Sequence, residues 1–243
     1  MSKKIYISPS DQTKNTYAAG NTNEAIQCRK IATSLVAALQ RCGFEAKTNL
    51  TASMADRVRE GNAWVADLYV AVHTNAFNEE VAGTRIFAYA LTGEGYNAAK
   101  AVFDALAPIT PGTSENIKAR PELYEVRNSK APCVYVEADF HDVDAVALWI
   151  IENTAQIAEA IAKGICNYFG VKYVAAGSNA SRYKTIDDVP KELRAETNEL
   201  IASGAFKGKG GDAGLDVTED MLRCMIINMR YTKKAIAESK ENK

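Results

Sequence analysis

The sequence is poor in histidine, has no closely spaced cysteine pair and contains no long apolar run. Only two histidines, His73 and His141, occur in 243 residues. The five cysteines include no Cys-x-x-Cys pair, so we expect reduced thiols rather than a disulfide or sulfur-ligated zinc framework. No apolar stretch approaches the ~20 residues of a membrane span. We therefore predict that the protein has no membrane partner.

Charge of one sign is also missing. The chain has 29 basic and 30 acidic residues, so it lacks the positive field that nucleic-acid binding usually needs, and we predict no nucleic-acid partner. Near the N-terminus, the apolar run from Ile5 to Ser8 is far shorter than the apolar region of a signal peptide. We expect no signal peptide and synthesis in the cytoplasm.

Strand-like and helix-like segments alternate through the first two thirds of the chain. Apolar or alternating runs predict strands at 4–8, 44–49, 68–73, 83–89, 123–127 and 133–137. Helical spacing and capping residues predict helices at 23–42, 53–66, 94–106 and 146–169. This order favours an α/β fold of three layers, with a mainly parallel sheet flanked by helices.

The composition changes after Phe169-Gly170, where small and polar residues follow. We predict a first domain over 1–172, a linker over 173–182 and a small helical module over 183–243. In the module, Pro190 starts one expected helix and Thr218 caps another.

Chemically versatile residues follow three of the predicted strands. They are Pro9 to Gln12, His73 to Asn75, and Glu137 to Asp139. Because ligands of such sheets bind beyond the carboxyl ends of the strands, these segments are expected to converge. Together with Glu24, just after the Gly20 turn, they are typical of a metal-dependent hydrolase.

Four segments occur in an order that resembles the zinc-dependent N-acetylmuramoyl-L-alanine amidases. The family pattern has Asp-x-Gly-His-Gly after the first strand, Gly-x-x-Glu at a helix start, Ala-Asp-Leu before a strand ending His-x-Asn-Ala, and Pro-x-x-x-x-Glu. The corresponding segments are Gly20-Asn-Thr-Asn-Glu24, Ala66-Asp-Leu68, His73-Thr-Asn75-Ala76 and Pro132-Cys-Val-Tyr-Val-Glu137. The resemblance covers about residues 3 to 170.

The resemblance implies that Glu24 and His73 are zinc ligands and that Glu137 is the general base. A catalytic zinc usually has three protein ligands and an open position, where it lowers the pKa of bound water to about 7. A nearby carboxylate can then carry a proton to the departing amine. Outside the family pattern, Glu24 could instead be a first-turn acid favoured by the helix dipole.

The first motif departs from the family pattern. Aligning Ile7 to Gln12 with it places Asp11 where the first histidine ligand stands. Aspartate can bind zinc, so we predict Glu24, His73 and Asp11 as the metal ligands, and another divalent metal such as manganese is also possible. Asp11 could instead stabilise a turn, and Gln12 could be the ligand.

Other residues have less specific signals. We assign Asn75, Arg127 and Arg57 to substrate binding, although either arginine could be a solvated charge or a structural partner. His141 could enter the metal sphere, but we expect a surface position next to Asp142.

Residues 183–223 resemble an S-layer-homology-type repeat and the wall-targeting tails of lytic enzymes. The resemblance rests on Tyr183 to Pro190, Leu200 to Gly208 and Leu215 to Arg223. It implies a module that binds a cell-wall polymer; the alternative is a structural hairpin that docks on the main domain or forms an oligomer.

Together these features predict a peptidoglycan hydrolase that cuts the amide between N-acetylmuramic acid and L-alanine. An endolysin that acts on the bacterial wall after release from the cytoplasm by a holin-type partner would fit a chain without a signal peptide. The alternatives are a non-catalytic wall-binding protein derived from an amidase, which Asp11 favours, and a metallopeptidase acting on another peptide.

Overall fold

The computed structural model describes residues 2–176, 182–204, 215 and 217–241. Contacts within the chain divide it into two compact units, Met1–Ala176 and Gly177–Lys243. The predicted linker, 173–182, only partly belongs to the described residues. Its first part packs on the first unit, because Arg41 donates from Nε to the carbonyl oxygen of Val174 at 2.8 Å.

A six-stranded sheet forms the centre of the first unit, in the order β2-β1-β3-β6-β4-β5. Neighbouring strands are parallel except β4 and β6, which are antiparallel. The strands are β1 (Lys4–Pro9), β2 (Glu45–Thr48), β3 (Leu68–Asn75), β4 (Arg85–Ala88), β5 (Asn116–Ala119) and β6 (Cys133–Phe140). The predicted α/β fold with a mainly parallel sheet is confirmed.

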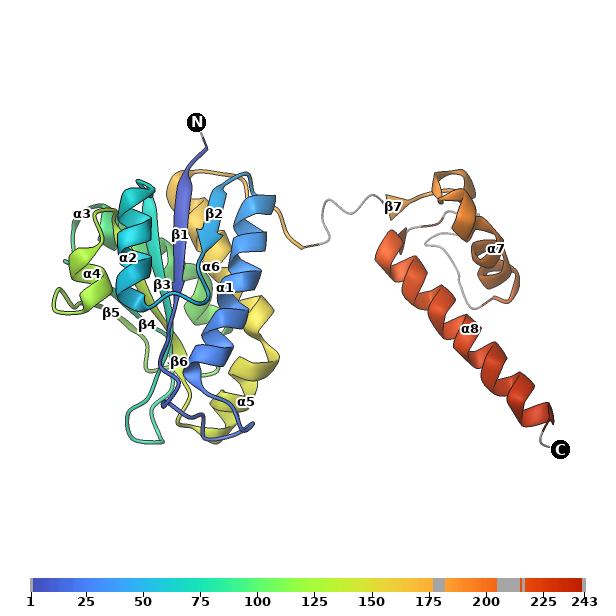
Figure 1. Cartoon of the computed structure of the whole chain (residues 1–243), viewed down its shortest axis with the longest axis horizontal. Helices are drawn as coiled ribbons and strands as arrows, with labels where there is room; N and C mark the ends of the chain where they lie inside the picture. Colours follow the sequence, from blue (N-terminus) through green and yellow to red (C-terminus); the bar gives the residue numbers. More distant parts are fainter. Residues whose placement is uncertain (1, 177–181, 205–214, 216, 242–243) are drawn as a thin grey trace. The chain divides into compact units, whose positions relative to one another are not determined.

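Helices cover both faces of this sheet (Figure 1). They are α1 (Glu24–Arg41), α2 (Met54–Ala63), α3 (Gly93–Leu106), α4 (Tyr124–Asn128), α5 (Asp144–Glu152) and α6 (Thr154–Phe169), with a short 3-10 turn, η1, at Ala107–Ile109. Alternate residues of the central strands, such as Val70 and Val134, form one large apolar core with α1, α3 and α6. Gly164 allows α6 to approach α3 closely, since a Cβ there would lie 2.5 Å from Cα of Val102.

The opposite face of the sheet carries a smaller apolar cluster and several polar groups. Tyr6, Tyr69 and Tyr135 belong to this cluster, which lies near α2 and α4. The rings of Tyr6 and Tyr69 stack with centroids 5.6 Å apart. Because α2 and α4 are short, this face is only partly covered and can hold a site.

The prediction is wrong for a segment that contributes to the site. Residues 123–127 were expected to form a strand, but Tyr124–Asn128 is the short helix α4. A single apolar run of this length does not distinguish a strand from one turn of helix. The helix matters because it turns the carboxylate of Glu125 into the protein, where its side chain is fully buried.

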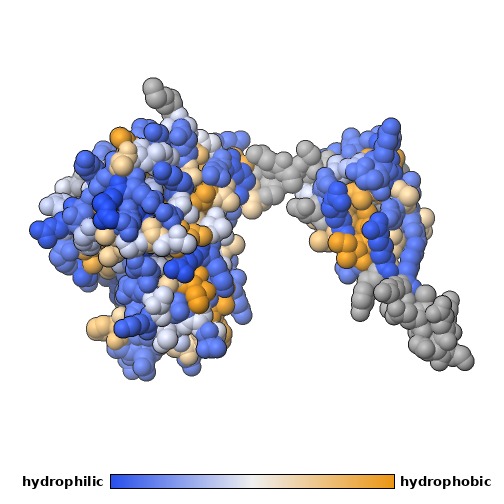
Figure 2. Space-filling view, viewed as in Figure 1, coloured by the Kyte–Doolittle hydropathy of each residue, from blue (hydrophilic) through white to orange (hydrophobic). Residues whose placement is uncertain are grey.

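The second unit has its own small apolar core. Its elements are β7 (Arg182–Tyr183), the 3-10 turns η2 (Ile186–Asp188) and η3 (Lys191–Leu193), α7 (Arg194–Ala202), β8 (Val217–Thr218) and α8 (Glu219–Glu241). Val189, Leu193, Leu222 and Ile226 are buried in this core. Met221 and Ile227 are exposed, and Figure 2 shows apolar surface on this unit.

All five cysteines are free, as predicted, and only Cys224 is exposed. In the described part of the chain, no helix is long and apolar enough to cross a membrane.

Candidate active site

His73 lies near the carboxyl end of β3 on the partly covered face of the sheet. Val72, the preceding residue, faces the large core, so the side chain of His73 points to the opposite face of the sheet. The imidazole stacks on the ring of Tyr135 in the neighbouring strand β6, with centroids 4.3 Å apart and planes 15° from parallel. This contact fixes the plane of the ring and leaves its two nitrogens to polar partners.

Both ring nitrogens of His73 contact buried carboxylates. Nδ1 lies 2.9 Å from Oε1 of Glu24, and Nε2 lies 3.0 Å from Oε2 of Glu125. Although burial alone lowers the pKa of the imidazole, its hydrogen bonds to Glu125 and Glu24 outweigh this effect and raise the pKa to about 10. At neutral pH the ring is therefore a cation that donates to a carboxylate on each side.

Glu24 reaches His73 because α1 starts at the carboxyl edge of the sheet. The side chain of Asn23 caps this helix by accepting from the backbone nitrogen of Ile26 at 3.0 Å. The second carboxylate oxygen of Glu24 accepts from Nδ2 of Asn15 at 2.7 Å. Burial by itself raises the pKa of Glu24, but the bonds from His73 and Asn15 hold it below its usual value.

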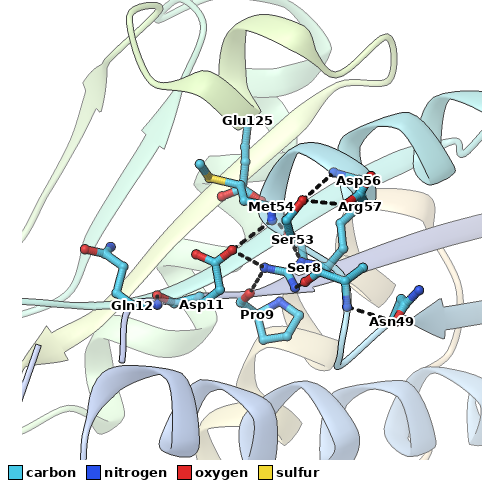
Figure 3. Close-up of polar contacts among 12 residues, drawn as sticks. Ser8, Pro9, Asp11, Gln12, Asn49, Ser53, Met54, Asp56, Arg57 and Glu125 are labelled. Atoms are coloured by element: carbon cyan, nitrogen blue, oxygen red, sulfur yellow. Dashed lines mark hydrogen bonds and ion pairs between the residues drawn. The ribbon is translucent and has the colours of Figure 1, made fainter. Parts of the chain in front are cut away.

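Glu125 is held by a buried network that joins α4, β1, β3 and α2. Its Oε1 accepts from the hydroxyls of Ser8 at 2.5 Å and Tyr69 at 3.1 Å. Ser8 in turn accepts from Nε of Arg57 at 2.9 Å. Figure 3 shows Ser8 and Arg57 meeting below Glu125. Burial of a carboxylate requires such partners, and here hydroxyl donors and the His73 cation supply them.

Arg57 is part of this internal network and does not face a substrate. Only 1% of the residue is exposed, and Nη2 donates to the carbonyl of Pro9 at 2.6 Å while Nη1 donates to that of Ala52. The substrate-binding role predicted for Arg57 is therefore not supported, because its donors are bound to the protein. Arg127 lies on the exposed surface of α4 and lines a separate cavity with Tyr89.

Glu137 is the third acid of the site. It pairs with His73 across β3 and β6, so the two side chains project from the same face. Its Oε2 is buried and has no hydrogen-bond partner among the described residues. Burial raises the pKa of Glu137 to about 8. A carboxyl group with such a pKa can exchange a proton near neutral pH.

Asp11 does not join Glu24 and His73. Its Oδ2 accepts from the backbone nitrogen of Met54, at the start of α2, at 2.9 Å and lies 3.7 Å from Nη2 of Arg57. Figure 3 shows the carboxylate turned toward these two residues. The free N–H groups of a helix start and a buried guanidinium both attract a carboxylate. The alternative ligand, Gln12, is exposed and accepts from Asn15 at 2.8 Å.

The side chains as arranged do not fit a zinc ion with three protein ligands. Glu24 and His73 are bonded directly to each other, and the other nitrogen of His73 is bonded to Glu125. Within the described ranges, no three His, Cys, Asp or Glu side chains are grouped so that they could hold a metal ion. The chemistry that these residues support is proton exchange at Glu137 beside a fixed imidazolium.

The second histidine is buried, whereas a surface position was expected. Nδ1 of His141 lies 2.9 Å from the hydroxyl of Thr74, and its ring stacks on Tyr17 with centroids 4.8 Å apart. It follows β6 directly and is held by the backbone of Asn75, to which its N–H donates at 2.7 Å. His141 therefore has a structural role, in which it joins the ends of β3 and β6.

A cavity of about 400 Å³ adjoins the site, and Asn75, one of the predicted substrate-binding residues, lines it. Three cations, Arg85, Lys118 and Arg120, line it too. These cations and Glu125 were not predicted from the sequence. Each cation lies in or next to a short strand without a distinctive motif, and only the pairing of β4 with β5 and β6 brings them together.

Comparison with known proteins gives one family and one fold. The family model described as N-acetylmuramoyl-L-alanine amidase matches residues 5–167. This range includes Glu24, His73, Glu125 and Glu137. No curated protein sequence matches the chain significantly.

Solved amidase structures share the fold of the first unit. The N-acetylmuramoyl-L-alanine amidase AmiC2 of Nostoc punctiforme is 24% identical over 69% of this chain and 97% of its own, with a TM-score of 0.62. The catalytic domain of CwlV, an amidase from Paenibacillus polymyxa, is 17% identical over 70% and 99%, with a TM-score of 0.62. The catalytic domain of the CD27L endolysin, which targets Clostridia difficile, is 21% identical over 69% and 97%, with a TM-score of 0.56.

Proposed function

This chain belongs to the N-acetylmuramoyl-L-alanine amidase family, and from that premise we propose that it hydrolyses the amide between the lactyl group of N-acetylmuramic acid and L-alanine in peptidoglycan. The observation that carries the proposal is the position of Glu137. It is a buried carboxyl group with one unpartnered oxygen, next to a fixed His73, at the carboxyl edge of the sheet. A proton-transferring group is what this hydrolysis requires.

In the proposed reaction, Glu137 is the general base. It takes a proton from the water whose oxygen attacks the lactyl carbonyl carbon, and it returns a proton to the alanine nitrogen as the C–N bond breaks. The products are a free lactyl carboxylate and a peptide with an L-alanine amino terminus. His73 stays in place between Glu24 and Glu125, so its positive charge favours the ionised form of Glu137.

Product analysis of digested sacculi tests this proposal. We expect the parent chain to release peptides with new L-alanine amino termini, together with muramic acid that carries a free lactyl carboxylate, and His73→Ala to release neither. If the parent releases neither product, the amidase proposal is wrong. If it cleaves other peptide bonds, the metallopeptidase alternative gains support.

A second candidate is a wall-binding protein that has lost catalysis. It is favoured by the position of Asp11, which is bonded at the start of α2 rather than to His73. Binding of zinc, or of another divalent metal such as manganese, by Glu24, His73 and Asp11 stays a prediction. Metal analysis of the protein after incubation with excess zinc tests it: about one zinc per chain, lost in Glu24→Ala, supports a metal site, and no zinc together with no products supports the wall-binding candidate.

We also propose that the second unit holds the enzyme on a wall polymer. Its small independent core and its exposed Met221 and Ile227 support a separate binding or oligomerisation role. Leu222→Asp, which places a charge in this core, should reduce sedimentation of the full chain with purified sacculi. Unchanged sedimentation would favour a purely structural role.

Release from the cytoplasm onto the bacterial wall, as by an endolysin with a holin-type partner, is part of the same proposal. Expression in a bacterium with and without a co-expressed holin tests it. Lysis should require both proteins.

A further inference from the structure

The cavity beside Glu137 combines positive charge with aromatic walls. Arg85, Lys118 and Arg120 supply the charge, and Phe77, Phe87 and Phe140 supply the rings. No acidic side chain of the described residues lines it. A cavity with this lining suits an anionic ligand that also has an apolar part.

The pairing of the strands places this cavity directly next to the proposed base. Glu137 lies between His73 of β3 on one side and Arg85 of β4 on the other. Paired residues of adjacent strands project from the same face, and the strands are about 4.8 Å apart. The same pairing sets Lys118 of β5 beside Phe87. Arg120 is close enough to Glu137 to lower its pKa, against the larger effect of burial.

Arg85 has a donor that the protein does not use. Its Nη2 donates to the hydroxyl of Ser114 at 2.8 Å, and its guanidinium lies 5.4 Å from the ring centroid of Phe140. Its Nη1 is buried and has no hydrogen-bond partner in the part of the chain that the structure describes. A buried donor without a hydrogen-bond partner is unfavourable. Because Arg85 lines the cavity, a ligand oxygen that reaches Nη1 would remove this penalty.

The other two cations differ from Arg85 in exposure or pairing. Lys118 is exposed, whereas Arg120 is half-buried like Arg85, lies over Phe87 with its guanidinium carbon 5.2 Å from the ring centroid, and contacts Glu122. They can attract an anion but hold it less firmly than Arg85, because solvent screens the charge of Lys118 and Glu122 pairs with Arg120.

We propose that Arg85 binds a carboxylate of the peptide stem, on the residue that follows L-alanine, and thereby makes the enzyme select acidic stems. The inference rests on the proposed amidase function. In an extended chain, the residue that follows L-alanine lies about 7 Å from the scissile carbonyl. Arg85 pairs with Glu137 across β4 and β6, so the anion site is on the strand next to the proposed base. The rings of Phe87 and Phe140 then contact the aliphatic part of the acidic residue.

Two synthetic substrates that differ only in charge test the proposal. One is muramyl-L-alanyl-D-glutamate with free carboxylates, and the other is its diamide. Arg85→Gln should raise KM for the acid by about 10- to 100-fold, as expected for a charge-assisted hydrogen bond of about 1.5–3 kcal/mol. It should change kcat by less than about threefold and leave the KM of the diamide nearly unchanged.

Two variants complete the design. Lys118→Gln, at an exposed position, should shift the acid-to-diamide ratio in the same direction by about two- to fivefold. Arg59→Gln removes a charge of the same sign from the exposed side of α2, away from the cavity. It should leave the KM of both substrates unchanged. If Arg85→Gln raises the KM of both substrates equally, Arg85 acts through the electrostatic field at Glu137 or through folding, and the proposal is wrong.

Failure of the proposed function gives a distinct result. If the parent hydrolyses neither substrate, calorimetry still measures the binding of N-acetyl-L-alanyl-D-glutamate to the cavity. Binding that is lost in Arg85→Gln supports the carboxylate site in a non-catalytic protein. No binding by the parent overturns the inference.

Discussion

Glu137 lies between two charged regions, which differ in whether their charged groups are paired within the protein. On one side, His73, Glu24 and Glu125 are almost fully buried and paired with one another. On the other side, Arg85, Lys118 and Arg120 line an open cavity, and Arg85 keeps an unused donor. Buried charges must be paired within the protein, whereas charges at a cavity can be left for a ligand.

Charged residues of the two regions should have different roles. Loss of a charge from the buried region should reduce stability as well as turnover, because a partner is left unpaired. Loss of a charge from the cavity should change substrate affinity and leave the fold intact. The proposed base, between the two regions, should affect turnover most and stability least.

The largest effect is expected for the residue between the two regions. Glu137→Gln removes the base and should lower turnover by about 10²- to 10⁴-fold. Stability should stay the same or rise, since the amide has no charge to bury. Hydrolysis of sacculi and thermal unfolding measure the two effects, with Glu45→Gln on the exposed edge strand β2 as the control. Full activity in Glu137→Gln would remove this residue from the mechanism.

A change within the buried region should affect both turnover and stability. Glu125→Gln leaves the His73 cation with one carboxylate and should cost about 3 kcal/mol of unfolding free energy, the order expected when a buried ion pair loses one partner. The ¹⁵N shift of Nε2 of His73 should also change, which a general loss of packing would not cause. Tyr69→Phe, which removes only one donor to Glu125, should cost about 1 kcal/mol. Equal costs for both variants would contradict the view that the ion pair dominates.

The stability of the first unit should depend on pH through Glu137 and His73. The pKa of Glu137 is about 8 in the folded protein, above its usual 4.5, so its contribution to stability is lost as pH rises from 4.5 to about 8. The pKa of His73 is raised from 6.5 to about 10, so its contribution is fully present below pH 6.5 and is lost as pH rises through about 10.

Both shifts have the same sign, so Tm of the first unit should fall between pH 6 and pH 9. Each kcal/mol lost corresponds to about 2–4 °C in a domain of this size. Calorimetry at fixed ionic strength measures the slope, and Glu137→Gln should make it shallower between pH 6 and pH 8. A Tm that rises over this range would contradict the pairing of His73 with two carboxylates.

The smallest effect is expected at Asp11, which lies outside both regions. Asp11→Asn keeps a side-chain oxygen at the start of α2 and should cost about 0.5–1 kcal/mol, a value typical of helix capping. Turnover should remain within about twofold of the parent. If turnover and bound zinc were both lost, Asp11 would be a metal ligand as the sequence suggested, and its bond to Met54 would not describe the loaded enzyme.

Some of the residues that the sequence motifs singled out lie close together in the structure. Glu24 and His73 were expected to meet, and their side chains are 2.9 Å apart. Glu137 was expected at the same edge of the sheet and pairs with His73. These three residues belong to segments whose order alone indicates the family, and each follows a strong local signal, either a helix start or the end of an apolar strand.

Other parts depended on contacts between distant segments. Glu125 was missed because residues 123–127 were interpreted as a strand, in which the carboxylate would have no reason to be buried. Asp11 was assigned to the metal by its position in a motif, but the start of α2 and Arg57 compete for its carboxylate. Arg57 was assigned to substrate, although it is buried and each of its three nitrogens donates a hydrogen bond to the protein.

The α/β fold of the first unit and the family to which the chain belongs could be predicted from the amino-acid sequence alone. These follow from local periodicity, from capping residues and from the order of short motifs. The position of His73 between two carboxylates and the three cations beside Glu137 depend instead on how distant segments pack together. Hydrogen bonding, burial and strand register act between residues far apart in the chain, and no local pattern specifies which charges they will pair and which they will leave for a ligand.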